Sequence, residues 1–192
     1  MIRLGVDFDN TLITYDSLFK KTALERDLIP IDFPENKTLI RNYLCRNNKA
    51  ELFTLLQGEI YGSKIFEACQ ADGMFDVLRD AQNNDVELFI VSHKTKKPYL
   101  GPKYDLHKSA VNWLQKNRFF DKSGINMPRK NVYFEDTKEN KIKRIETLGC
   151  SYFIDDLPEI LNMISSKIKK ILYKPLDKKS IKNNFICMDH WS

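Results

Sequence analysis

Short apolar runs alternate with amphipathic stretches along most of this chain, and that alternation limits the folds it can adopt. The apolar runs are rich in β-branched and aromatic residues, as strands are, and they cover 2–8, 87–91, 132–134, 152–154, 170–173 and 185–188. Between them, apolar residues recur at helical spacing, for example at 106, 110, 111 and 114. Alternating strands and helices form a parallel sheet joined by right-handed crossovers. We therefore predict an α/β fold with a parallel sheet core and helices on both faces.

One interval of about 60 residues breaks the alternation, and it is too long for an ordinary loop. It contains no convincing strand, and its helix-like pieces cover 18–28, 39–44 and 50–60. Pro30 and Pro34 separate the first piece from the second. We predict that 13–72 is a small helical insertion into a core formed by 1–12 and 73–192. A helix over 74–82 would return the chain to the sheet.

The composition favours a folded protein, and its basic excess is compatible with nucleic acid, a membrane surface or a small anionic substrate as partner. Of the 192 residues, 42% are hydrophobic, which is enough to fill a core and argues against disorder. The net charge of +5 is mild, and much of the excess comes from lysines at 167, 169, 170, 174, 178 and 179. No aromatic residues alternate with these lysines as they would in a single-strand binding groove. A solvated surface explains the lysines best, and nucleic acid is disfavoured as a partner.

The location of the protein is also suggested by the sequence. An acidic residue already at position 7 argues against a signal peptide, and the apolar runs are too short to span a membrane. None of the four cysteines (Cys45, Cys69, Cys150 and Cys187) forms a C-x-x-C pair, so we expect free, buried thiols in a reducing compartment. We predict a cytoplasmic protein with no membrane partner. The sequence does not indicate the oligomeric state.

Residues that can carry chemistry gather where the predicted strands end. The first run is followed by Asp7, Asp9 and Thr11, the second by Ser92 and His93, and the run at 152–154 by Asp155 and Asp156. In open parallel sheets the active site forms beyond the carboxyl ends of the strands. Because alternate strand residues point the same way, Asp7 and Asp9 can face one site.

Such a cluster of carboxylates needs a cation. The charges repel one another, and all-oxygen ligands with few protein donors suit magnesium (Mg2+), which also bridges to phosphate oxygens. With the phosphoryl charge neutralised, one carboxylate could attack phosphorus. A second could protonate the leaving oxygen and later activate water. The residue types therefore predict phosphoryl transfer.

These motifs resemble those of the haloacid dehalogenase-like (HAD) hydrolase superfamily. The sequence D-x-D-x-T at 7–11, Ser92 after the second run, an upstream lysine and the Asp155–Asp156 pair occur in the order that this family shows, and the resemblance covers about 2–173. It implies a Rossmann-like core with a helical cap between the first two motifs, as in small-molecule phosphatases. An acid two residues after the nucleophile favours phosphoryl chemistry, since the dehalogenases of this superfamily lack it.

By this resemblance Asp7 is the catalytic nucleophile and Asp9 the general acid/base. The phosphate would be bound by Ser92 and by a lysine for which Lys141 is the best placed, ahead of Lys138 and Lys143. Thr11 and His93 are further phosphate-binding candidates. Magnesium would be held by Asp7, Asp9, Asp156 and Asp155, with Asp9 acting through its backbone carbonyl. Which member of the Asp155–Asp156 pair ligates directly stays open.

Other interpretations compete with this one. Asp155 or Asp156 could cap the helix that follows, and Ser92 could be a helix N-cap. The residues after the second run, His93, Lys94, Lys96 and Lys97, could contact the substrate, and the last two could equally lie in a solvated loop. Among functions, we expect a phosphatase acting on a small phosphorylated metabolite, either a sugar phosphate or a nucleotide. A phosphomutase or phosphotransferase, a non-catalytic binding module, and a nucleic-acid end-processing enzyme remain alternatives.

Overall fold

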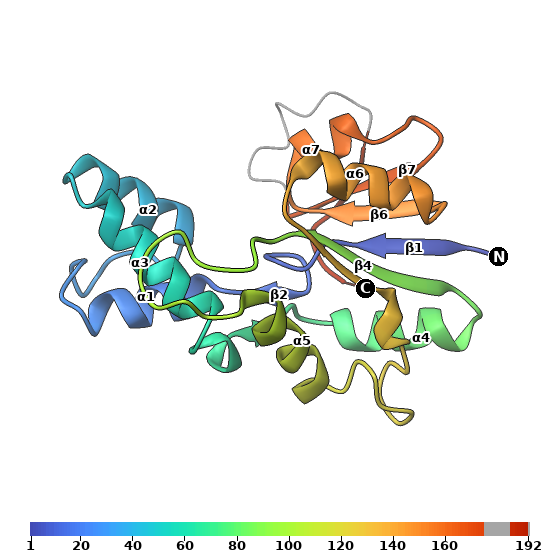
Figure 1. Ribbon diagram of the computed structural model, residues 1–192, viewed down its shortest axis with the longest axis horizontal. Helices are drawn as coiled ribbons and strands as arrows, with labels where there is room; N and C mark the ends of the chain where they lie inside the picture. The colour runs from blue at the N-terminus through green and yellow to red at the C-terminus, as the bar shows by residue number, and fades with distance from the viewer. Residues whose placement is uncertain (175–184, 192) are drawn as a thin grey trace. The chain divides into compact units, whose positions relative to one another are not determined.

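The computed structural model of the chain describes residues 1–174 and 185–191 and divides into two compact units (Figure 1). The first unit comprises Met1–Ile13, Gln70–Lys94 and the described part of Leu114–Ser192, and the second comprises Thr14–Cys69 and Thr95–Trp113. Lys178 and Lys179 of the predicted basic surface lie outside the described residues.

The first unit contains a six-stranded sheet in the order β5-β4-β1-β6-β7-β8. Its strands are β1 (Arg3–Val6), β4 (Glu87–His93), β5 (Val132–Glu135), β6 (Tyr152–Asp155), β7 (Lys169–Tyr173) and β8 (Ile186–Met188). Each strand pairs with its neighbours in parallel. All six predicted strands are present, and the predicted α/β, Rossmann-like parallel sheet is confirmed. Since β1 lies at the centre, its carboxyl end lies between those of β4 and β6.

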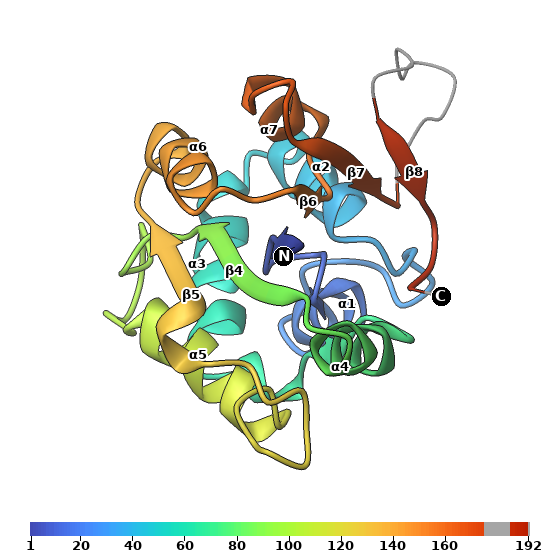
Figure 2. The same ribbon diagram turned by 90° about the vertical axis from the view of Figure 1, so that its right-hand side faces the viewer.

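Helices cover both faces of this sheet, as predicted. Figure 2 shows α6 (Lys138–Thr147) and α7 (Pro158–Met163) over one face and α4 (Met74–Asn83) over the other. The side chain of Thr137 caps α6 by accepting a hydrogen bond from the Asn140 backbone N–H at 3.1 Å. Between the sheet and α6 and α7 lies a core of buried apolar side chains that includes Val91, Ile145, Phe153, Leu161 and Leu172. This packing fixes α6 against the strands, and α6 carries one of the site residues.

The second unit is helical. It contains α1 (Asp16–Leu24), α2 (Lys37–Arg46), α3 (Ala50–Tyr61), the short 3-10 helix η1 (Ile65–Glu67) and most of α5 (Leu106–Lys116). The rings of Phe19 and Phe53 stack with their centroids 5.5 Å apart. The Trp113 indole N–H donates to the Ala68 carbonyl at 3.2 Å. The three helices predicted between 18 and 60 are therefore present.

The sequence did not indicate that 95–113 would pack with these helices. Two glycines of the α3 region allow it: a Cβ on Gly58 would lie 2.9 Å from Pro98, and one on Gly62 would overlap the Tyr104 ring. The helical insertion was expected at 13–72, whereas the contacts group 14–69 with 95–113. Whether this unit acts as a cap stays a prediction.

Three further expectations need correction or comment. We expected no strand between 12 and 85, but β2 (Ile13–Thr14) and β3 (Cys69–Gln70) form a two-stranded sheet. The four cysteines are free as expected, yet only Cys150 is buried, so the expectation of burial was wrong for the other three. Burial raises the pKa of the Cys150 thiol to about 11.

Within the described residues, no helix is long and apolar enough to span a membrane.

Candidate active site

The loop that follows β1 carries the first group of site residues and is held by backbone hydrogen bonds. Asp7 directly follows the last residue of β1, and its N–H donates to the Ile154 carbonyl at 2.9 Å. Farther along, the Phe8 carbonyl accepts from the Leu12 N–H at 3.0 Å, which closes a tight turn. Asn10 occupies the left-handed region at φ 60°, which Asn tolerates better than most residues. These backbone hydrogen bonds therefore fix the position of Asp7 and the conformation of the loop that carries Asp9.

A C-terminal residue supports the same turn from the other end of the chain. The Trp191 indole N–H donates to the Thr11 carbonyl at 3.2 Å, and the Trp191 ring packs 5.8 Å from that of Tyr173. Trp191 is buried, and Gly73 lies against its backbone with no room for a Cβ. The loop of the site is thus attached to two distant segments of the first unit.

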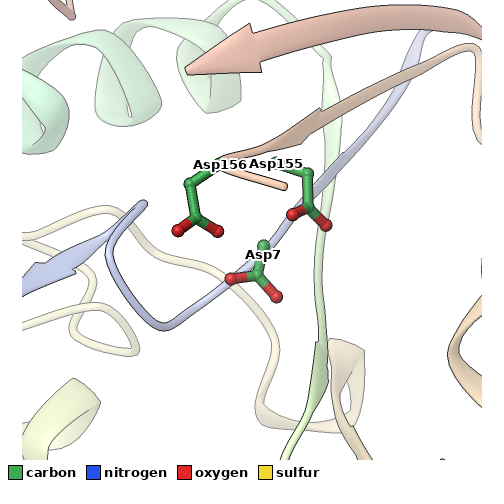
Figure 3. Close-up of side chains that lie close together, drawn as sticks. All are labelled: Asp7, Asp155 and Asp156. Carbon is green, nitrogen blue, oxygen red and sulfur yellow. The ribbon is translucent and has the colours of Figure 1, made fainter. Parts of the chain in front are cut away.

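Three carboxylates converge at the carboxyl ends of β1 and β6. One carboxylate oxygen from each of Asp7, Asp155 and Asp156 lies within 4.8 Å of the others, and the three side chains lie close together (Figure 3). Asp7 and Asp155 are almost completely buried, at 4% and 0% exposed. Because β1 and β6 are neighbours in register, two segments almost 150 residues apart meet here. The sequence predicted this convergence from strand ends alone.

A buried lysine lies among these carboxylates. Lys141, on the first turns of α6, is 2% exposed, and its Nζ donates to Asp7 at 2.5 Å and to Asp155 at 2.6 Å. Burial by itself would lower the pKa of Lys141, but the charges of Asp7 and Asp155 more than offset this and raise it. The ammonium is therefore charged at neutral pH. A variant that lacks this ammonium would leave two buried carboxylates without it, so we expect its loss to cost about 3–5 kcal/mol of stability.

Burial and the neighbouring carboxylates together raise the pKa values of two acids of the site. Burial raises the pKa of Asp7 to about 7, with Lys141 opposing the shift and Asp155 adding to it. Burial also raises the pKa of Asp156 to about 8, aided by the charges of Asp7 and Asp155. One lysine does not neutralise three carboxylates, so a further cation would be stabilised at this position.

The donor set fits a small divalent cation, and the two members of the acidic pair differ in their engagement. Asp155 uses both oxygens within the protein: one accepts from the Leu157 N–H at 2.9 Å and the other from Lys141 at 2.6 Å. Asp156 is only partly buried, and its Oδ2 accepts from the Asn10 amide at 3.2 Å. Asp156 thus has the freer carboxylate, which favours it over Asp155 as a direct ligand. The helix-capping interpretation of the pair is wrong: the N-cap of α7 is Leu157, which has no side-chain cap hydrogen bond, and the Asp155 carboxylate accepts from the N–H of Leu157 itself.

Asp9 is held by a residue to which the sequence analysis gave no defined role. Lys94 follows β4 directly, and its Nζ donates to both carboxylate oxygens of Asp9 at 2.9 Å. The only signal in the sequence was the position of Lys94 two residues after Ser92, because alternate residues of an extended segment point the same way. Ser92 itself is 1% exposed in β4, one strand away from Asp7.

The other predicted phosphate-binding residues lie in different surroundings. The ring of His93 contacts the Asp136 carbonyl, with Nε2 3.2 Å from the oxygen, and so lies beside β5. Thr11 is fully buried, and its hydroxyl has no hydrogen-bond partner within residues 1–174 and 185–191. The structure brings Asp7, Lys141, Asp155 and Asp156 together and ties Asp9 to Lys94. Phosphate binding by Thr11, Ser92 and His93 stays a prediction.

The raised pKa values predict how stability depends on pH in metal-free protein. Asp7 and Asp156 titrate near pH 7 and 8 when folded, above their ordinary value of 3.8. Between about pH 4 and 8 the folded state therefore binds more protons than the unfolded state, so the free energy of unfolding falls as pH rises. Thermal melting in chelator should show a lower Tm at about pH 8.5 than at about pH 5.5 from this pair.

Two variants separate the site from the rest of the chain in this measurement. Asp156→Asn removes one titrating group, so its Tm should fall less steeply with pH. Asp76→Asn, which changes an exposed carboxylate paired with Arg79 on α4, should follow the wild type. Magnesium should raise Tm more at the higher pH, because it competes with protons for the same oxygens. If Tm changed with pH equally steeply in the wild type and in Asp156→Asn, the raised pKa of Asp156 would be contradicted.

Comparison with known proteins supports the architecture. No family model matches the chain, and no curated protein matches it by sequence. Solved structures do match. A HAD-family hydrolase of family IA, variant 3, from Entamoeba histolytica is 15% identical with a TM-score of 0.59, over 100% of this chain and 94% of that one. A HAD-superfamily hydrolase of subfamily IA, variant 1, from Geobacter sulfurreducens is 14% identical with a TM-score of 0.57, over 100% and 93%.

A third match is to a phosphoserine phosphohydrolase-like protein from Francisella tularensis, at 16% identity and a TM-score of 0.52, over 90% of this chain and 87% of that one. At this level of identity the similarity concerns the fold. The chain has the fold of the HAD-superfamily hydrolases, as the resemblance of its motifs implied.

Proposed function

We propose that this protein is a magnesium-dependent phosphatase that hydrolyses a small phosphorylated metabolite, a sugar phosphate or a nucleotide, through an aspartyl-phosphate on Asp7. The observation that carries the proposal is the buried cluster in which Lys141 bonds Asp7 and Asp155, with Asp156 beside them. A carboxylate nucleophile, a fixed ammonium and a partly available third carboxylate are the groups that phosphoryl transfer needs. The HAD-type fold supports the same conclusion.

The reaction would take place in two steps. In the first, a carboxylate oxygen of Asp7 attacks phosphorus, the ester P–O bond breaks, and Asp9 donates a proton to the leaving oxygen. In the second, Asp9 accepts a proton from a water molecule that attacks the same phosphorus, and the bond to Asp7 breaks to release inorganic phosphate. In both steps Lys141 would compensate the negative charge on the phosphoryl oxygens. Asp9 would act as the acid of the first step and as the base of the second.

Magnesium would be held by Asp7, Asp156 and the Asp9 backbone carbonyl. Asp155 would lie next to these ligands without binding the metal directly. When bound, it would neutralise phosphoryl charge that one lysine cannot. The residues themselves fit this role: Asp155 is already engaged by Leu157 and Lys141, whereas Asp156 is not so constrained. Ligation by these residues stays part of the proposal.

The helical unit would act as a cap that selects the substrate. Caps close over a reacting group and exclude water. The proposal extends the predicted insertion, 13–72, by the segment 95–113 that packs with it. The residue that links core and cap after β4 is Lys94, so the site and the proposed cap are joined directly along the chain.

Phosphate release from a panel of esters tests the function. Sugar phosphates, nucleotides, phospho-acids and p-nitrophenyl phosphate should be supplied with and without magnesium. At least one class should release phosphate in its presence. Release of an isomerised or transferred phosphate instead would favour a phosphomutase or phosphotransferase, and no product from any ester would favour a non-catalytic binding module.

Metal removal should abolish this activity. We expect no turnover in excess chelator and full recovery on adding magnesium, because the nucleophile, the phosphate and Asp156 otherwise repel one another. Calcium should replace it poorly, since its longer and looser coordination would misplace nucleophile and phosphorus. Turnover that persists in excess chelator would contradict the metal assignment.

A further inference from the structure

The first unit contains a second buried lysine near the proposed reaction centre. The side chain of Lys94 is 2% exposed, and its Nζ lies 2.9 Å from both oxygens of Asp9. The ammonium also lies 5.3 Å from the centroid of the Phe8 ring, which belongs to the same loop as Asp9. Its charge is therefore removed from water and lies against the Asp9 carboxylate and an aromatic face.

The backbone of Lys94 is fixed as firmly as its side chain. Its N–H donates to the Glu135 carbonyl at 2.9 Å, which continues the pairing of β4 with β5 beyond the last strand residue. The lysine therefore extends from a rigid part of the sheet. A carboxylate whose two oxygens both accept from one fixed ammonium cannot rotate without losing one of these bonds.

The two buried lysines form ion pairs with different aspartates of the site. Lys141 bonds Asp7 and Asp155, whereas Lys94 bonds Asp9. Asp9 is the more accessible partner of its pair, at 17% exposed against 2% for Lys94. The carboxylate can therefore reach a substrate, while the ammonium behind it is covered. This arrangement suits a group that acts on Asp9 rather than on the phosphate.

We propose that Lys94 is a positioning residue that holds the side chain of Asp9 in the orientation needed to donate a proton to the ester oxygen from the carboxylic acid, and to accept one from water as the carboxylate. The proposal rests on the phosphatase function proposed above. It assigns Lys94 no contact with the phosphoryl group. Its effect on the rate should therefore depend entirely on Asp9.

A double-mutant cycle tests this dependence. Lys94→Met, Asp9→Asn and the double variant should be compared in kcat and KM on p-nitrophenyl phosphate and on the fastest alkyl ester of the panel. We expect Lys94→Met to lower kcat on the alkyl ester by up to about 10²-fold, as misplacement of a catalytic group does, with little change in KM. Adding Lys94→Met to Asp9→Asn should cost less than about 2-fold more.

Independent losses that multiply in the double variant would overturn the proposal, because Lys94 would then act without Asp9. A rise in KM that persists in the Asp9→Asn background would likewise assign Lys94 to the phosphate. Lys94→Arg keeps a positive charge at this position and should retain more kcat than Lys94→Met. Lys169→Met is the matched control: this surface lysine of the same unit donates to the Tyr152 hydroxyl at 3.1 Å, and its loss should leave kcat unchanged.

Thermal melting of the same four proteins provides a readout that needs no turnover. Lys94→Met should lower Tm in the wild-type background, because Asp9 loses its buried partner, and should lower it less in the Asp9→Asn background. Equal shifts in both backgrounds would show that the pair is absent and overturn the proposal. If the wild type releases no phosphate from any ester, the proposed function is wrong, and so is the role of Lys94 in it. If the wild type is active but the losses in kcat are additive, only the role of Lys94 is wrong.

Discussion

Asp7→Asn is expected to release no phosphate from any ester, whether the leaving group is good or poor. An amide cannot form the acyl phosphate, and it removes one negative ligand of the proposed metal. A covalent nucleophile is needed for every turnover, so the loss in kcat should be on the order of 10⁴-fold or more. The measurement is phosphate release from p-nitrophenyl phosphate and from the best substrate of the panel, with magnesium.

The fold should survive this substitution, since Lys141 keeps its bond to Asp155. Asp7→Asn removes a carboxylate whose pKa burial raises to about 7, so its Tm near neutral pH should not fall sharply. Asp76→Asn serves as the control for an acid-to-amide change elsewhere in the first unit. An Asp7→Asn protein that keeps a tenth of wild-type activity would exclude Asp7 as the nucleophile.

Asp9→Asn is expected to affect esters unequally. A nitrophenolate departs without protonation, so the first step with p-nitrophenyl phosphate should survive in part. An alkyl ester needs the proton, so its hydrolysis should fall by about 10²–10⁴-fold, the range of general acid catalysis. Rapid mixing with p-nitrophenyl phosphate should show a burst of nitrophenolate and then slow turnover, because water lacks its base.

The comparison with Asp7→Asn makes this result specific. Asp7→Asn should show neither burst nor turnover, whereas Asp9→Asn should show the burst alone. Equal loss on both ester types with no burst would mean that Asp9 is not the acid/base. Its function would then be limited to shaping the loop between Asp7 and Thr11.

The parts of the structure that depend on local pattern were predictable from the sequence. Each of the six strands of the sheet is a short apolar run, and buried parallel strands differ in this way from the helices between them. In a parallel sheet the carboxyl ends of the strands lie at one edge. Asp7 follows one strand and the Asp155–Asp156 pair follows another, so their proximity could be predicted. The choice of Lys141 over Lys138 and Lys143 agrees with its position between Asp7 and Asp155.

The parts that depend on long-range contact were not predictable. The strands β2 and β3 have two residues each, too few to show any periodicity, so they were missed. The packing of 95–113 with α3 depends on close approach at Gly58 and Gly62, and a glycine in the sequence does not reveal its neighbour. The bond between Lys94 and Asp9 joins residues 85 positions apart. Their places after neighbouring strands put both at one edge of the sheet, but they do not reveal which of the charged groups there bond each other.

Burial was the least reliable expectation. Cys187 lies in β8 and was expected to be buried, but it is exposed there, and Cys45 and Cys69 are exposed as well. An apolar run indicates a strand without fixing which of its faces meets the core. Trp191 shows the reverse case: a residue near the chain end is buried and bonds the Thr11 carbonyl.

The central claim is that the phosphoryl group is transferred to Asp7, and trapping the intermediate tests it most directly. Asp9→Asn protein should be mixed with phosphate-labelled p-nitrophenyl phosphate and magnesium, quenched in acid during the burst, digested and mapped. The label should be found on the peptide that contains Asp7, and it should be lost on treatment with hydroxylamine, as an acyl phosphate is. The double variant Asp7→Asn with Asp9→Asn should carry no label. Label on any other residue, or burst kinetics without label, would contradict the account.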